Sequence, residues 1–225
     1  MNRPFREMSV LVTGGSRGIG SAIAERFASV GMKVVIHYLE AHEAANETAR
    51  RCLQYGSEVL TVSADLRSKE QILRMKEKVE HFGMMPDILV NNAGISHYGL
   101  LSDVTEEDWD QVMNVNLKGM FLCTQLFMPH MISQKYGRII NVSSIWGIAG
   151  ASCEVLYSTS KGGMNAFTKA LAKELAPSGI TVNAVAPGPV DTAMMERFES
   201  LEKEAIAENI PAGRFAQPEE VASLV

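Results

Sequence analysis

Short apolar runs rich in β-branched residues alternate along the whole chain with segments of helical periodicity. After the first run, for example, Ile19, Ile23, Phe27 and Val30 recur at helical spacing. Apolar runs of this kind are typical of strands buried on both faces, and a helix between consecutive strands implies parallel crossovers. The pattern therefore predicts an α/β fold with a doubly wound, mostly parallel sheet and helices on both faces. The predicted strands are 9–13, 33–38, 58–62, 87–91, 138–142 and 180–185.

Helix signals and chain length indicate a single domain over residues 1–225. Thr105 precedes the acidic segment EEDWDQV as an N-cap, and Pro218 follows Gln217 where a late helix would begin. Long helices are expected over 105–132 and 155–176. No Pro-, Gly- or Ser-rich linker, repeat or low-complexity tract divides the chain.

Composition argues against several classes of partner. The net charge of -5 does not suit a nucleic-acid surface, which needs clustered Lys and Arg. No apolar run approaches the roughly 18 residues of a membrane span, and the N-terminus lacks the apolar core of a secretory signal. Cys52, Cys123 and Cys153 lack metal-ligand spacing and are expected to be buried thiols in a reducing compartment. We therefore expect a cytoplasmic protein with no metal, nucleic-acid or membrane partner.

The segment TGGSRGIG, residues 13–20, joins the first predicted strand to the first helix. Gly14, Gly18 and Gly20 permit a tight turn in which a pyrophosphate approaches backbone N–H groups at a helix N-terminus. The spacing is G-x-x-x-G-x-G, not the common G-x-G-x-x-G, so a purely structural turn is the alternative. The position between strand and helix favours dinucleotide binding.

The end of the second strand, HYLE, bears on the choice of cofactor. An acid just past this strand would bind a ribose 2′-OH and repel a 2′-phosphate. His37 and Tyr38 stand there instead, and the first carboxylate is Glu40. Arg17 in the glycine turn can pair with a 2′-phosphate, with a solvated side chain as the alternative. The sequence favours NADPH over NADH.

Seven motifs occur in the order and spacing of a known family, and they extend over essentially the whole chain. With them the chain resembles the short-chain dehydrogenase/reductase family, and within it the 3-oxoacyl-[acyl-carrier-protein] reductases. The resemblance implies a Rossmann-type fold, an NAD(P)(H) cofactor and interconversion of a carbonyl and an alcohol. The motifs are TGGSRGIG (13–20), ADL (64–66), NNAG (91–94), NVNLKG (114–119), NVSSIWG (141–147), YSTSK (157–161) and APGPVDT (186–192).

The resemblance also implies roles for individual residues. Asp65 would contact the adenine and Asn91 the neighbouring part of the cofactor. The catalytic residues would be Asn116, Ser144, Tyr157 and Lys161. The further cofactor-binding residues would be Gly14, Ser16, Arg17, Gly18, Ile19, Gly20, Leu66, Asn92, Ala93, Gly94, Tyr157, Lys161, Pro187, Gly188, Val190 and Thr192.

The chemistry of carbonyl reduction explains the pair Tyr157 and Lys161. A Tyr hydroxyl can donate a hydrogen bond and then a proton to the carbonyl oxygen, but a pKa near 10 makes it slow. Lys161 lies at i+4, one helical turn away, where its charge can lower that pKa. It can also bind the nicotinamide ribose hydroxyls. Taken alone, Tyr157 and Lys161 could instead be an ordinary pair on the solvent-facing side of a helix.

Ser144 is expected to be the second donor to the carbonyl oxygen, at the sheet edge where open α/β sheets bind ligands. Ser143 is its competitor, and strand alternation should turn the two to opposite sides. Asn116 is expected at a distortion in a long helix, holding a water that relays protons to Lys161. Its alternative is a buried Asn with satisfied hydrogen bonds.

Other polar and apolar residues receive a plainer interpretation. His97 is interpreted as a pocket wall or surface residue and not as a base. Met194, Met195, Phe198 and Leu201 belong to an amphipathic segment that is either a mobile lid or a surface helix packed on the core. In the related reductases two basic positions beside the cleft bind acyl carrier protein. Lys135 matches one of them, and the other is Ser178.

The leading hypothesis is an NADPH-dependent reductase of a 3-oxoacyl thioester or similar ketone, with the acyl group on acyl carrier protein or coenzyme A. The alternatives are an alcohol, sugar or steroid dehydrogenase of the same family and a non-catalytic NADP-binding scaffold. The chain stops at PEEVASLV, short of the family's seventh strand. A homodimer through the long helices or a homotetramer is expected.

Overall fold

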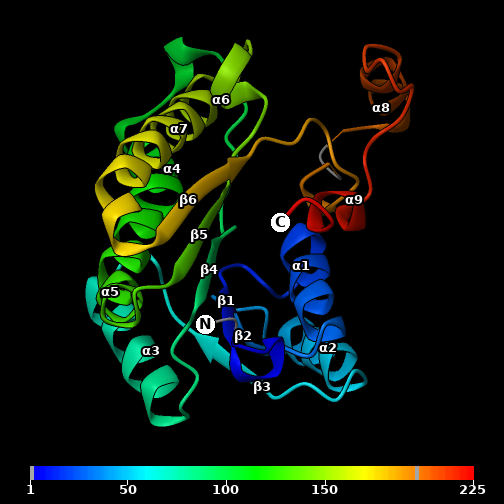
Figure 1. Ribbon diagram of the computed structural model, residues 1–225. Helices are drawn as coiled ribbons and strands as arrows, with labels where there is room; N and C mark the ends of the chain where they lie inside the picture. Colours follow the sequence, from blue (N-terminus) through cyan, green and yellow to red (C-terminus); the bar gives the residue numbers. More distant parts are fainter. Residues whose placement is uncertain (1–2, 196–197) are drawn as a thin grey trace.

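The computed structural model describes residues 3–195 and 198–225. These residues form six strands in a single sheet, every pairing is parallel, and the order is β3-β2-β1-β4-β5-β6 (Figure 1). Each strand lies within one residue of its predicted bounds, so the doubly wound parallel sheet is confirmed. The strands are β1 Ser9–Val12, β2 Lys33–Tyr38, β3 Val59–Ser63, β4 Ile88–Asn91, β5 Gly137–Val142 and β6 Ile180–Val185.

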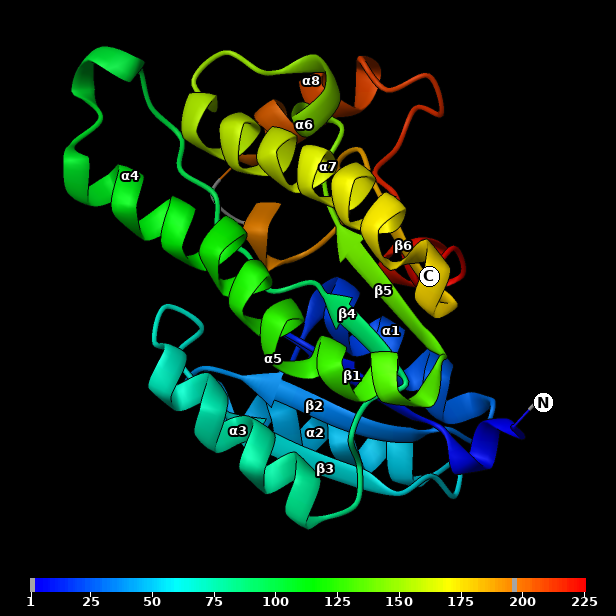
Figure 2. The ribbon, with the colours of Figure 1, turned by 60° about the vertical axis from the view of Figure 1, so that its left-hand side comes forward.

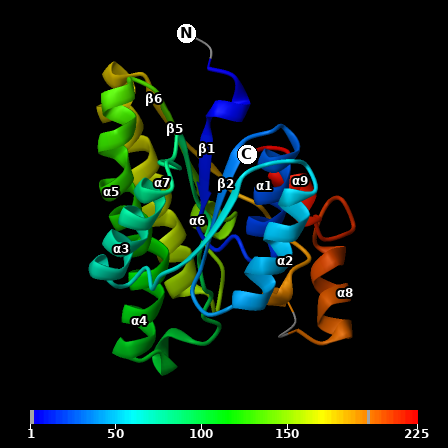
Figure 3. The same cartoon turned by 90° about the horizontal axis from the view of Figure 1, so that it is seen from below.

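Helices cover both faces of the sheet. Helices α3, α4, α5 and α7 lie on one side, and α1, α2 and α9 lie on the other, as the view from below also shows (Figures 1 and 3). Among the described residues the helices are α1 Gly18–Ser29, α2 His42–Leu53, α3 Lys69–His81, α4 Glu106–Met113, α5 Gly119–Gln134, α6 Trp146–Ala149, α7 Val155–Leu175, α8 Ser200–Glu208 and α9 Pro218–Ala222. Short 3₁₀ turns occur at Phe5–Glu7, Leu101–Asp103, Ala176–Ser178 and Ala193–Met195.

Two apolar cores form because successive side chains of a strand point to opposite faces of the sheet. Leu11 of β1 packs in the core that α3, α5 and α7 share, where Phe127 is fully buried. Its neighbours Val10 and Val12 pack in the other core, together with Ile23 of α1. Burial on both faces explains why these strands are apolar without alternation.

The long helix expected over 105–132 is present with a break in its hydrogen-bond register. A π-helical stretch, Asn114–Lys118, joins α4 to α5, so the distortion expected at Asn116 is confirmed. Thr105 caps α4 as predicted, since its Oγ1 accepts a hydrogen bond from Asp108 N at 3.1 Å. Gln217 is the N-cap residue of α9, which begins at Pro218, and its backbone N–H donates to Glu220 Oε2 at 2.8 Å.

The cysteine prediction is right for two residues and wrong for the third. Cys52 and Cys123 are buried, whereas Cys153 is partly exposed in the turn before α7, at a φ of 62°. No helix within residues 3–195 and 198–225 has the length and apolar character needed to cross a membrane.

Parallel strands bring their carboxyl ends to one edge of the sheet. The glycine turn follows β1, the segment from Asn92 follows β4, and Ser143 and Ser144 follow β5. Because α1 and α5 lie on opposite faces, the chain changes direction between β1 and β4, where doubly wound sheets bind ligands. Helix α8 lies beyond this edge (Figure 2).

Candidate active site

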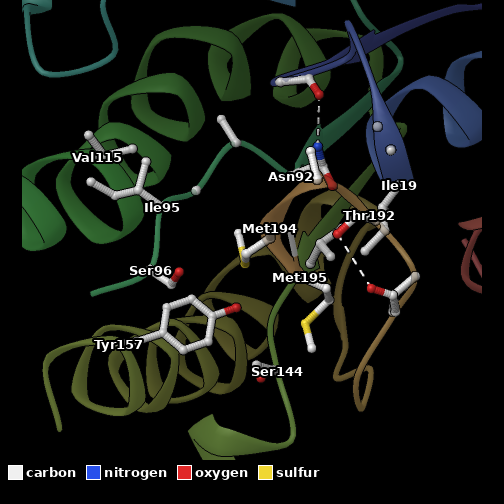
Figure 4. Close-up of a pocket in the computed structure, with 18 of the residues that line it drawn as sticks. Ile19, Asn92, Ile95, Ser96, Val115, Ser144, Tyr157, Thr192, Met194 and Met195 are labelled. Carbon is white, nitrogen blue, oxygen red and sulfur yellow. Dashed lines mark hydrogen bonds between the residues drawn. The ribbon is translucent and has the colours of Figure 1, made fainter. Parts of the chain in front are cut away.

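A cavity of about 1190 Å³ opens along the carboxyl edge of the sheet. Every residue that the sequence nominated for the site lines this cavity except Asn91 and Asn116. Tyr157 points its hydroxyl toward the middle of the cavity, and Ser144, Met194 and Met195 surround it (Figure 4). The fold thus gathers residues from the segments that follow all six strands around one space.

The glycine turn forms the floor of one end of the cavity. Gly14 and Gly18 adopt φ values of 62° and 55°, which side chains disfavour. A Cβ on Gly20 would lie 2.1 Å from Gly14 O, and one on Gly18 would lie 3.2 Å from Thr192 Cγ2. The turn therefore leaves its backbone open to a ligand at the start of α1, which fits a pyrophosphate.

Asn92 holds this turn in place. Its Nδ2 donates to Thr13 O at 3.0 Å and to Gly14 O at 3.1 Å. Its backbone N–H donates to Thr13 Oγ1 at 2.9 Å. The segment after β4 is thereby tied to the turn after β1.

Asn91, expected at the cofactor, lies beneath the cavity floor. It is buried, and its Nδ2 donates to Thr124 Oγ1 at 3.2 Å and to Asn141 Oδ1 at 2.9 Å. The next residue in the chain, Asn92, turns to the cavity instead. The side chain of Asn91 belongs to a polar group between the sheet and α5.

Asp65 is already engaged by a neighbour that sequence reasoning missed. Arg67 Nε donates to both carboxylate oxygens of Asp65, each at 3.0 Å, and Arg67 Nη2 donates at 2.7 Å. Hydrogen bonding from Arg67 lowers the pKa of Asp65. Because both residues line the cavity, the adenine contact expected of Asp65 would be made by a carboxylate that Arg67 orients. The sequence signal was an Arg two residues after the Asp, in ADLR.

The charges at this end of the cavity have both signs. Arg17 is exposed at the N-cap of α1 and lines the cavity, as does Arg67. Glu40 lines it too, although it lies two residues past β2. The first carboxylate after β2, which the sequence placed at Glu40, therefore belongs to the cavity wall.

Lys161 is a buried cation close to Tyr157. Its side chain is 3% exposed, and its Nζ lies 5.7 Å from the centroid of the Tyr157 ring. Burial lowers the pKa of Lys161 to about 8. Among the described residues Nζ has one hydrogen-bond acceptor, Val142 O at 2.7 Å. An ammonium has three donors, so the position suits a ligand with hydroxyl acceptors, such as the ribose of a nicotinamide nucleotide.

Ser144 has the contacts of a hydrogen-bond donor to a ligand. Its Oγ accepts from Trp146 N at 3.2 Å, which leaves the hydroxyl hydrogen for another acceptor. Ser143 Oγ instead donates to Lys161 O at 3.4 Å. Both serines line the cavity because β5 ends at Val142, so the alternation argument that separated them is wrong.

Asn116 does not line the cavity but clamps two of its walls. Its Oδ1 accepts from Ile95 N at 2.8 Å, and its Nδ2 donates to Ile95 O at 2.9 Å. The same Nδ2 donates to Ser160 Oγ at 3.0 Å, and Ser160 Oγ donates to Tyr157 O at 2.8 Å. The fully buried Asn116 side chain therefore links the loop after β4 to the helix that carries Tyr157.

The far end of the cavity is walled by apolar side chains. Met194, Met195 and Phe198 line it, and the Phe198 and Tyr98 rings meet edge to face at 6.0 Å between centroids. Leu201 is 77% exposed and does not line the cavity. Three of the four residues of this segment, Met194, Met195 and Phe198, line the cavity, which is the arrangement that the lid alternative expects.

His97 and Lys135, two polar residues that the sequence analysis discussed, lie outside the cavity. His97 does not line the cavity, and its Nε2 lies 3.7 Å from Asp108 Oδ1. Lys135 follows α5 and precedes β5, so it lies near the amino ends of the strands. Lys135 therefore does not lie beside the cleft of its own chain, and the expectation of a basic residue there is wrong for a single chain.

Comparison with known proteins agrees with this geometry. A family model described as short chain dehydrogenase matches residues 8–203. The oxidoreductase YmfI of Bacillus subtilis is 44% identical over 216 residues, covering 95% of this chain and 88% of YmfI. The 3-oxoacyl-[acyl-carrier-protein] reductase of Synechocystis sp. is 44% identical over 216 residues, covering 96% of this chain and 86% of the relative. The 3-oxoacyl-[acyl-carrier-protein] reductase FabG of Aquifex aeolicus is 45% identical over 215 residues, covering 96% and 87%.

Proposed function

The chain belongs to the short-chain dehydrogenase family of oxidoreductases, and we propose that it reduces a ketone to a secondary alcohol with NADPH. The proposed substrate is a 3-oxoacyl thioester carried on acyl carrier protein or coenzyme A. The observation that carries the proposal is that Ser144, Tyr157 and Lys161 line the same cavity as the glycine turn. The donors and the nucleotide-binding backbone thus face one space.

Each of the three side chains has a task at the carbonyl group. A nicotinamide cofactor, when bound, supplies the hydride that reaches the carbonyl carbon. Ser144 donates a hydrogen bond to the carbonyl oxygen as negative charge grows there, an effect often worth a few kcal/mol. Tyr157 gives a second hydrogen bond and then its proton. The Lys161 charge favours the resulting phenolate and so favours proton transfer.

We assign Asn116 to the step in which Tyr157 regains a proton after it has given its own to the substrate. We assign to the π-helical stretch around it the position of a water that passes a proton to Lys161 and on to Tyr157. The support is the distortion itself, since π-helical turns are often found at functional sites. The clamp of Asn116 on Ile95 and Ser160 keeps the walls beside this path in register.

The choice of NADPH rests on Arg17. An exposed guanidinium at the N-cap of α1 can pair with a 2′-phosphate in a charge-assisted hydrogen bond. Glu40 opposes this preference, because a carboxylate repels a 2′-phosphate and suits a free ribose hydroxyl. Arg67 is paired with Asp65 at this end of the cavity, so the proposed preference for NADPH rests on Arg17 against Glu40.

The choice of an acyl substrate rests on the apolar end of the cavity and on the relatives. Ile95, Val115, Met194 and Phe198 offer an apolar wall beside Tyr157. Relatives that span nearly the whole chain are named 3-oxoacyl-[acyl-carrier-protein] reductases. An acyl chain would lie along the apolar wall with its 3-oxo group at Tyr157.

The proposal is tested by measuring kcat and KM with NADPH and NADH against 3-oxoacyl thioesters, simple diketones, sugars and steroids. Turnover is expected to be fastest with NADPH and a 3-oxoacyl thioester. Preferred oxidation of an alcohol, sugar or steroid would support a dehydrogenase instead. Tight NADPH binding without turnover of any substrate would contradict the enzyme proposal and support a non-catalytic scaffold.

Two variants separate the parts of the proposal in the same assay. Tyr157→Phe removes the proton donor, so kcat should fall about a hundredfold or more while NADPH affinity changes little. Tyr55→Phe, at an exposed tyrosine, is the control. Arg17→Ala should lower the preference for NADPH over NADH, whereas Arg26→Ala, exposed on the same helix, should not. An unchanged preference in Arg17→Ala would contradict the role given to Arg17.

We also propose a homodimer or homotetramer in which α4, α5 and α7 form one interface. Trp109 of α4, Phe121 of α5 and Val155 of α7 are large apolar side chains that are more than one third exposed. Exposed apolar residues on one helical layer are typical of a surface that a second subunit covers.

A further inference from the structure

A histidine that the proposed chemistry does not use lies directly under the glycine turn. His37 belongs to β2 and is 2% exposed. Its Nδ1 accepts a hydrogen bond from Gly14 N at 3.1 Å, and its Nε2 lies 2.9 Å from Ala64 O. Its own backbone carbonyl accepts from Gly15 N at 2.8 Å. His37 therefore contacts both the turn that follows β1 and Ala64, the residue that follows β3.

The two contacts determine the form of the imidazole ring. A backbone N–H can only donate, so Nδ1 must present its lone pair to Gly14. A carbonyl oxygen can only accept, so Nε2 must carry the hydrogen that is donated to Ala64. Only the neutral ring protonated at Nε2 satisfies both. Burial lowers the pKa of His37 to about 4, which keeps this neutral form near neutral pH.

The partners of His37 both border the nucleotide end of the cavity. Gly14 begins the glycine turn, where it adopts a left-handed φ, and Ala64 directly precedes Asp65. The Gly14 N–H is donated to the ring, so it serves the shape of the turn. A side chain without an acceptor would leave this N–H without that partner.

We propose that His37 is a positioning residue that holds the glycine turn and the segment at Ala64 and Asp65 in the conformation that binds the adenosine and pyrophosphate part of the cofactor. The inference rests on the proposed use of a nicotinamide cofactor. It predicts an effect on cofactor affinity and not on the chemical step, because the ring contacts neither Tyr157 nor Ser144.

Three variants isolate the two hydrogen bonds. In His37→Asn, Oδ1 can replace Nδ1 as the acceptor for Gly14 N–H. In His37→Gln, the longer amide can replace Nε2 as the donor to Ala64 O. His37→Leu removes both. His81→Asn, at an exposed histidine of α3, is the control.

The readouts are the dissociation constants of NADPH and of reduced nicotinamide mononucleotide, followed by fluorescence, and kcat at saturating cofactor. His37→Leu removes both hydrogen bonds, so it should weaken NADPH binding about tenfold or more and leave the mononucleotide affinity unchanged. His37→Asn should recover most of the affinity. In all variants kcat should stay near that of the unaltered enzyme.

A further readout needs no activity. Hydrogen exchange at the amides of Gly14 and Gly15 in the cofactor-free protein should be faster in His37→Leu and should return toward the original rate in His37→Asn. Equal NADPH affinity in the original chain and His37→Leu would overturn the proposal. Failure of His37→Asn to bind better than His37→Gln would also overturn it, and this comparison holds even where His37→Leu does not fold. Absence of NADPH and NADH binding by the unaltered chain would instead refute the proposed function.

Discussion

At the scale of single residues, the site depends on a buried cation. Lys161 is buried, and within residues 3–195 and 198–225 its ammonium donates one hydrogen bond, to Val142 O. Burial disfavours the charged form and lowers the pKa of Lys161 to about 8. The same desolvation strengthens its field at Tyr157, which lies in the same helix one turn earlier.

This pKa predicts an alkaline limit on activity. As pH rises through about 8, Lys161 loses its proton, and the charge that favours the Tyr157 phenolate disappears. The value of kcat/KM, which reports the free enzyme, should therefore fall above about pH 8. Lys169→Met, at an exposed lysine of α7, should keep the profile. A profile in which kcat/KM stays level well above pH 8 would contradict the assignment.

At the scale of elements, an irregular stretch of helix connects the parts of the site. The π-helical residues Asn114–Lys118 lie between α4 and α5 and turn the Asn116 side chain toward Ile95 and Ser160. The loop after β4 and helix α7 both contribute cavity walls, so Asn116 sets their separation. The family resemblance indicated a distortion here, but the partners of the amide come from segments 21 and 44 residues away.

Removal of this clamp should affect stability and catalysis together. Asn116→Ala deletes three buried hydrogen bonds, so the free energy of unfolding should fall by about 2 kcal/mol or more. The value of kcat should fall as well, because Tyr157 and Ile95 lose their common anchor. Denaturant unfolding and steady-state kinetics measure both effects. Asn165→Ala, which removes a single bond to Gly147 O, is the matched control and should be milder.

At the scale of the whole molecule, both helical layers leave apolar side chains uncovered. The layer with α4, α5 and α7 exposes Trp109, Phe121 and Val155, and the proposed subunit interface lies there. Leu53, on α2, is exposed on the opposite layer. The interface is therefore testable with substitutions on the two layers.

A charge introduced into the proposed interface should separate the subunits. Phe121→Asp places a carboxylate where an apolar surface would be buried, so the oligomer should dissociate toward monomer. Leu53→Asp, of similar exposure on the other layer, should leave the assembly unchanged. Light scattering coupled to size-exclusion chromatography measures the mass. An oligomer that survives Phe121→Asp and dissociates with Leu53→Asp would place the interface on the other face.

Sequence by itself determined the elements and the local pairs. The six strands, the cap at Thr105, the glycine turn and the one-turn spacing of Tyr157 and Lys161 are short-range patterns. Backbone sterics and hydrophobic periodicity act over a few residues, so such features can be predicted along the chain.

Tertiary structure alone decided which side chains meet. Arg67 takes both oxygens of Asp65, Glu40 reaches the cavity, and the ring of His37 bridges Gly14 and Ala64. Sheet order places β2 between β1 and β3, and no residue spacing encodes that order. These contacts depend on how distant segments pack together, because neighbours in a parallel sheet are set by the crossovers between strands and not by distance along the chain.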